Sequence, residues 1–145
     1  MSIEEIASIA REMRTAIERT DRALLPITFL DFPRGSCGDA AQVLGRHLKE
    51  FGHEGFQYVL ASRGDQRDNS WHSHAWIERQ GLIVDITADQ FPDFPHKVFV
   101  GTESPFHSTF EIEETQEADY AIYDAHTVST LNRAYHEILK QYGHA

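Results

Sequence analysis

The chain has 145 residues, of which 41% are hydrophobic and 11% aromatic, and its formal net charge at pH 7 is −10. This composition is typical of one globular domain, so we expect residues 1–145 to form a single domain with its own core. The negative charge, unrelieved by any basic run, argues against nucleic acid as a partner. The sequence contains no apolar stretch typical of a membrane span or signal peptide, and its single cysteine leaves no intramolecular disulfide. We therefore expect a soluble, cytoplasmic protein.

The first predicted element is a helix that begins with a capping-box pair, Ser2 and Glu5, and runs to about Thr20. Pro26 and Pro33 then interrupt helical periodicity. Because a proline disfavours the helical conformation of the residue before it, we expect an extended approach to the next element.

The second predicted helix starts at the only cysteine, Cys37, and ends near Phe51. Its apolar positions recur at helical spacing, at Ala40, Leu44, Leu48 and Phe51. Ser36 and Asp39 resemble a capping box, which predicts a well-defined start. A thiol in the first turn meets free backbone N–H groups and the positive end of the helix dipole, which favour the thiolate. The same N–H groups could bind an oxyanion.

Apolar alternation predicts several strands after this helix. They cover residues 55–62, 71–78, 82–87 and 97–100, with a possible edge strand at 118–123. The polar residues 63–70 predict a surface loop, and the pair 80–81 predicts a tight turn. Residues 106–117 have no clear period. Apolar residues at helical spacing predict a closing helix, at Leu131, Tyr135, Ile138 and Tyr142.

The turn at 80–81 decides whether His74 and Asp85 meet. With a turn of two or four residues, Arg79 pairs with Leu82 and Trp76 pairs with Asp85. His74 is then the diagonal neighbour of Asp85 on the same face, with roughly 7–8 Å between the backbones. A turn of three residues would place them on opposite faces.

Asp85 is the preferred carboxylate because it lies between Val84 and Ile86. A carboxylate in an apolar strand needs a partner. Asp89 lies nearer the end of the strand, where we expect it to cap a turn. We expect Trp76 to lie in the core, and His72, His96 and His107 to lie on the surface or in loops. Because His72 shares a strand face with His74, it could alternatively support the His74 side chain.

The runs SCGDAA, HAWIE and VDIT resemble the core motifs of the transglutaminase-like branch of the papain-like cysteine enzymes. The resemblance covers about residues 33–91. It implies that Cys37 begins a helix, that the His-Ala-Trp segment carries His74 on the following sheet, and that the Asp-x-Thr segment carries Asp85 on the next strand. These three residues would form a catalytic triad.

The resemblance implies an α+β, papain-like domain, in which the cysteine helix packs on a mostly antiparallel sheet between N- and C-terminal helices. Cys37 would attack a peptide, carboxamide or other acyl carbon to give a thioester, with His74 as base and then acid and Asp85 orienting it. Water as acceptor would make a peptidase, amidase or deamidase, and an amine would make a transglutaminase or acyltransferase. We expect a peptide, protein or amide substrate and no cofactor; the oligomeric state stays open.

Two alternatives remain open from the sequence. One is a binding module on the same fold that has lost turnover. The other is a zinc site made by Cys37, His72, His74 and Asp85, all of which are accepted zinc ligand types. The absence of a second cysteine and the i, i+2 spacing of the two histidines on one strand make the zinc site the weaker hypothesis.

Overall fold

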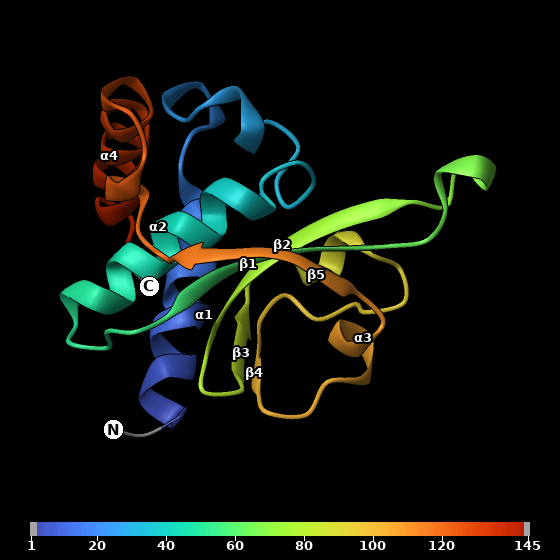
Figure 1. The fold of residues 1–145 in the computed structure, drawn as a ribbon. Helices are drawn as coiled ribbons and strands as arrows, with labels where there is room; N and C mark the ends of the chain where they lie inside the picture. Colours follow the sequence, from blue (N-terminus) through green and yellow to red (C-terminus); the bar gives the residue numbers. More distant parts are fainter. Residues whose placement is uncertain (1–2, 144–145) are drawn as a thin grey trace.

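The computed structural model describes residues 3–143, and within them four α-helices and a five-stranded antiparallel sheet form an α+β fold (Figure 1). The helices are α1 (Ile3–Arg19), α2 (Cys37–Glu50), α3 (Pro105–Ser108) and α4 (Ala125–Leu139). The strands are β1 (Gln57–Arg63), β2 (His72–Arg79), β3 (Leu82–Asp85), β4 (Phe99–Gly101) and β5 (Glu111–Glu117). Their order in the sheet is β4-β3-β2-β1-β5. None of the described helices has the length and apolar character of a membrane span.

The sheet separates two hydrophobic clusters because side chains alternate across its strands. On one face, Tyr58 and Ile77 join the larger cluster with α1, α2 and α4. On the other face, Val59 and Trp76 pack with aromatic residues of the segments that include α3, namely Phe91, Phe106 and Phe110. Figure 1 shows the three long helices gathered to one side of the sheet and α3 on the other. The strands β1 and β2 therefore each contribute side chains to both clusters.

Most of the predicted elements are present. The first, second and closing helices are confirmed, although Ser2 of the predicted capping box lies outside the described residues. The hairpin register is also confirmed, since Arg79 pairs with Leu82 across a two-residue turn. Gln80 and Gly81 both have positive φ, 49° and 83°, as the tight turn between twisted strands requires. Arg63, the first residue of the predicted loop, ends β1, and residues 64–70 form an exposed loop with one short 3-10 turn, Gln66–Asp68.

The end of the predicted sheet differs from the sequence-based expectation. The proposed edge strand at 118–123 is wrong, because Tyr120–Ile122 forms a 3-10 turn whose cap, Asp119, accepts a hydrogen bond from the Ala121 N–H. The edge strand is instead β5, which pairs with β1. β5 lacks apolar alternation because most of its side chains are exposed.

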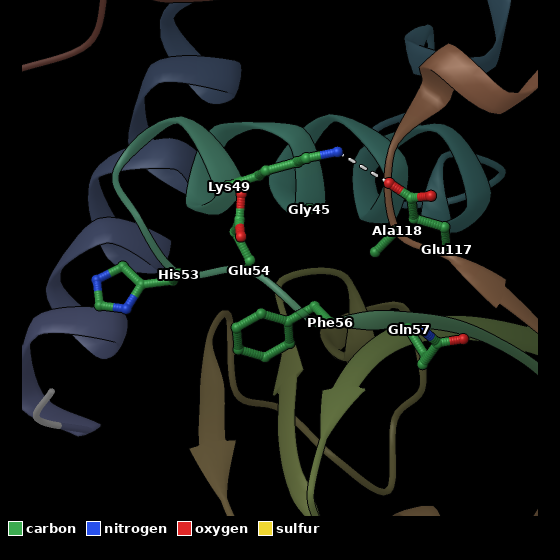
Figure 2. Close-up of a pocket in the computed structure, with 9 residues that line it drawn as sticks. Gly45, Lys49, His53, Glu54, Phe56, Gln57, Glu117 and Ala118 are labelled. Carbon is green, nitrogen blue, oxygen red and sulfur yellow. Dashed lines mark hydrogen bonds and ion pairs between the residues drawn. The ribbon is translucent and has the colours of Figure 1, made fainter.

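The middle of α2 passes very close to the backbone that follows β5 (Figure 2). A Cβ atom added at Gly45 would lie 2.1 Å from the Ala118 carbonyl oxygen. One turn later, Lys49 binds Glu117 at 2.9 Å and Asp119 at 3.2 Å. A cavity of about 350 Å³ opens beside this contact, and its lining contains none of the three predicted triad residues.

His47 is buried where α2 meets the C-terminal segment. Its Nδ1 lies 2.7 Å from the Tyr135 hydroxyl oxygen, and its ring packs against Phe51 and Tyr142. Its Nε2 has no hydrogen-bond partner among the described residues. Burial lowers the pKa of His47 to about 4, only partly opposed by Glu50.

We expect acid to destabilise the fold through His47. The folded protein holds this ring neutral, whereas the unfolded chain protonates it below about pH 6.5, so the free energy of unfolding falls as the pH drops from 6.5 towards 4. The loss should be about 3 kcal/mol. Urea unfolding at several pH values measures it, and the His47→Phe variant should have a flatter pH dependence over this window. An equally steep dependence in the variant would contradict the assignment.

Candidate active site

The first turn of α2 is fixed by the segment before it rather than by the predicted capping box. Ser36 precedes the helix, but its hydroxyl donates to the Thr28 carbonyl oxygen at 2.7 Å and caps no N–H. The Asp39 carboxylate accepts from the Thr28 hydroxyl at 2.6 Å. The capping-box prediction is therefore wrong, because Thr28 supplies competing partners. Within residues 3–143, no side chain accepts a hydrogen bond from the backbone N–H of Cys37 or Gly38.

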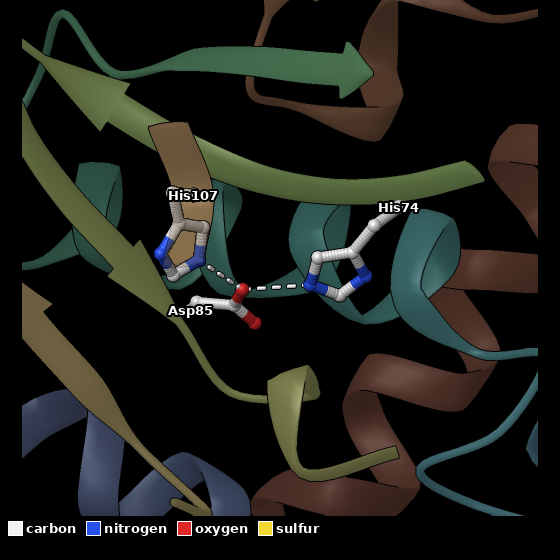
Figure 3. A group of neighbouring side chains, drawn as sticks. All are labelled: His74, Asp85 and His107. Atoms are coloured by element: carbon white, nitrogen blue, oxygen red, sulfur yellow. Dashed lines mark hydrogen bonds and ion pairs between the residues drawn. The ribbon is translucent and has the colours of Figure 1, made fainter. Parts of the chain in front are cut away.

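His74 and Asp85 form a buried pair. His74 lies near the start of β2 and Asp85 at the end of β3, and the confirmed register places them on one face. The His74 Nε2 is 2.7 Å from the Asp85 Oδ2, and both side chains are fully buried (Figure 3). Two residues on neighbouring strands, eleven positions apart, thus meet as the turn predicted.

The half-buried Cys37 thiol lies close enough to the same imidazole to help raise its pKa. Because Asp85 occupies Nε2, Nδ1 is the nitrogen that can exchange a proton with this thiol. Burial alone would lower the pKa of His74, but the charge and hydrogen bond of Asp85, together with a hydrogen bond to Cys37, raise it to about 9. The Gln90 amide nitrogen also lies 3.3 Å from Nδ1. The structure therefore brings all three predicted site residues together.

Asp85 is held ionised by several donors. Its Oδ1 accepts from the Thr87 N–H at 2.9 Å, and its Oδ2 accepts from His74 and from His107, each at 2.7 Å. Burial opposes ionisation, yet the charge of His74 and the hydrogen bonds from His107 and His74 hold the pKa of Asp85 well below its usual range. A carboxylate so satisfied can orient an imidazole without taking its proton.

His107 is a site residue that the sequence analysis missed. The sequence predicts a surface or loop position, but His107 is buried in α3. Its Nε2 hydrogen-bonds Asp85 Oδ2, the same oxygen that the His74 Nε2 contacts. Its Nδ1 lies 2.5 Å from the Ser104 hydroxyl oxygen. Asp85 can only accept, so a neutral His107 donates from Nε2 and accepts from Ser104 at Nδ1. The Ser-Pro start of a short helix, just before this histidine, is the one sequence signal that could have indicated it.

The other candidates take structural positions. Trp76 is buried in the smaller cluster, as predicted, and its indole N–H donates to Glu78 at 3.1 Å. His72 and His96 are exposed, also as predicted. Asp89 lies within the 3-10 turn Ala88–Gln90, but the prediction that it caps a turn is wrong. Both its oxygens instead bind the Arg14 guanidinium, at 2.7 and 2.9 Å.

The hypothetical zinc set of Cys37, His72, His74 and Asp85 is not supported, because Cys37 and His72 do not belong to a cluster of ligand atoms. Among residues 3–143, the group whose metal-ligand atoms all lie within 4.8 Å of one another is His74, Asp85 and His107. Two ligands that share a tetrahedral zinc at about 2.0–2.1 Å lie ~3.3 Å apart. The nitrogen-to-oxygen distances of 2.7 Å are shorter and match hydrogen bonds instead.

No protein-family model, curated protein or solved structure matches this chain. A functional assignment is therefore argued from the local chemistry of Cys37, His74 and Asp85. Together these side chains can supply a sulfur nucleophile, a base that also serves as an acid, and a buried anion that steadies the charged base.

Proposed function

We propose that this protein is a thiol-dependent acyl hydrolase or acyltransferase with a transglutaminase-like, papain-like fold. The observation that carries the proposal is the buried His74 imidazole, which is held by the Asp85 carboxylate at 2.7 Å and lies close to the Cys37 thiol at the start of α2. A surface or purely structural cysteine would not need a buried histidine of raised pKa beside it. The motif order along the chain supports the same family.

The proposed reaction has two half-reactions. His74 Nδ1 takes the thiol proton, and the Cys37 sulfur attacks the acyl carbon to give a tetrahedral oxyanion. Collapse breaks the bond to the leaving group, which receives the proton from the imidazolium, and leaves a thioester on Cys37. His74 then removes a proton from water or an amine, which attacks the thioester, and the thiol is released with that proton.

Asp85 and the first turn of α2 support these steps. The carboxylate holds Nε2 protonated, so that Nδ1 is the nitrogen that exchanges a proton with the thiol. The first-turn N–H groups can donate to the oxyanion. The substrate is a peptide, protein or other amide or acyl donor, and no step requires a cofactor.

The pH dependence of Cys37 alkylation by iodoacetamide tests the proposal, with intact mass as the readout. At about pH 6 we expect alkylation of the wild type at least roughly tenfold faster than that of His74→Ala, because the imidazolium stabilises the thiolate. The matched control is His72→Ala, which removes an exposed histidine from the same strand and should react like the wild type.

Equal, slow alkylation of the wild type and His74→Ala would contradict the proposal. The chain would then be better described as a binding module with a structural cysteine.

A further inference from the structure

Tyr58 on β1 brings a hydroxyl to the first turn of α2. A Cβ atom added at Gly38 would lie 3.3 Å from the Tyr58 hydroxyl oxygen, so this oxygen occupies the space beside the residue that follows Cys37. The Tyr58 side chain is only 8% exposed, but its hydroxyl is not among the fully buried unpartnered atoms. Within residues 3–143, the hydroxyl also has no hydrogen-bond partner. An otherwise buried tyrosine therefore ends in an unpaired polar group beside Gly38, the residue that follows Cys37.

We propose that the Tyr58 hydroxyl is the side-chain donor of the oxyanion hole, acting with the first-turn N–H groups of α2. This inference rests on the proposed function of Cys37. An oxyanion formed at an acyl carbon on the cysteine sulfur would lie between the first-turn N–H groups and this hydroxyl. These groups are hydrogen-bond donors without a side-chain acceptor, so they can all donate to the oxyanion.

Two observations favour Tyr58 over the other polar groups nearby. Its hydroxyl stays protonated and able to donate, because burial and the neighbouring Tyr123 and Cys37 raise its pKa. The Gln90 amide nitrogen is already held by the Thr87 carbonyl oxygen at 3.2 Å and lies against His74. Gly38 fits the same arrangement, since a side chain there would crowd the hydroxyl.

The test compares two reactions of the same sulfur. Acylation by p-nitrophenyl acetate passes through an oxyanion, whereas alkylation by iodoacetamide does not. In Tyr58→Phe, which keeps the ring and its packing, we expect acylation to fall by about 10- to 100-fold while alkylation changes less than about twofold. Released p-nitrophenolate measures the first rate and intact mass the second.

The matched control is Tyr123→Phe. The Tyr123 hydroxyl accepts from Gln42 and Gln116, at 2.9 and 2.8 Å, so its loss should leave the ratio of the two rates unchanged. A second variant, Gly38→Ala, keeps the hydroxyl but crowds it, and should lower acylation selectively.

The outcomes separate this inference from the proposed function. An unchanged ratio in Tyr58→Phe overturns the oxyanion role, and so does a parallel fall of both rates, which would mean that the hydroxyl acts on the thiolate itself. Failure of the proposed function has a different signature, namely wild-type alkylation no faster than that of His74→Ala.

Discussion

The Asp85→Asn variant is expected to lose acyl-transfer activity by a factor on the order of 10³. The Asp85 charge raises the pKa of His74 to about 9 against the effect of burial, and asparagine removes that charge. An asparagine whose oxygen stays on the two histidines also turns its NH2 group towards the Thr87 N–H, which in the wild type donates to Oδ1 at 2.9 Å. Acylation by p-nitrophenyl acetate and iodoacetamide alkylation at about pH 6 should both fall, because the neutral imidazole no longer stabilises the thiolate.

The matched control for this variant is Asp89→Asn. Asp89 also makes a two-pronged ion pair, with Arg14, but it does not contact His74. Asp89→Asn should therefore cost stability, measured by urea unfolding, while both rates at Cys37 stay close to those of the wild type. Equal rates in the wild type and Asp85→Asn would contradict the role of Asp85.

The Gly45→Ala variant is expected to lose more than about 3 kcal/mol of stability, enough to unfold many domains of this size. Helix propensity alone predicts the opposite, a gain of about 1 kcal/mol. The added methyl group would, however, lie 2.1 Å from the Ala118 carbonyl oxygen and 2.5 Å from the Ala118 Cβ, so α2 and the backbone after β5 would have to separate. Circular dichroism during urea unfolding measures the loss.

Gly52→Ala is the control for this substitution. Gly52 follows the same helix with φ at 88°, and nothing lies within 4 Å of an added Cβ atom, so this change should cost only the backbone strain, about 1 kcal/mol. If Gly45→Ala were as stable as the wild type, α2 could not pack against Ala118 as described.

The pairing of His74 with Asp85 was predictable because it depends on local information. A two-residue turn at 80–81 fixes the register of a hairpin, and side-chain alternation then fixes which residues share a face. The position of Cys37 at the start of α2 was predictable for a similar reason, since the apolar spacing of the helix lies within one stretch of sequence.

The rest of the site depends on contacts between distant segments. His107 reaches Asp85 from a four-residue helix, which is too short to show a helical period in the sequence. The sequence predicts Ser36 as a helix cap, but its hydroxyl donates to the carbonyl oxygen of Thr28, eight residues earlier. Tyr58 fits the alternation of a core strand, and only the packing of β1 beneath α2 reveals where its hydroxyl ends. Local propensity cannot weigh such competing partners.

The edge of the sheet formed by β5 carries charged side chains that disfavour aggregation. β5 is an outer strand, and its unpaired backbone groups would otherwise be a template for a strand of a second molecule (Figure 1). Four exposed glutamates, Glu111, Glu113, Glu114 and Glu117, line this strand. Two copies placed edge to edge would align these like charges, so repulsion disfavours a continuous intermolecular sheet at neutral pH. Protonation of the carboxylates in acid would remove that repulsion.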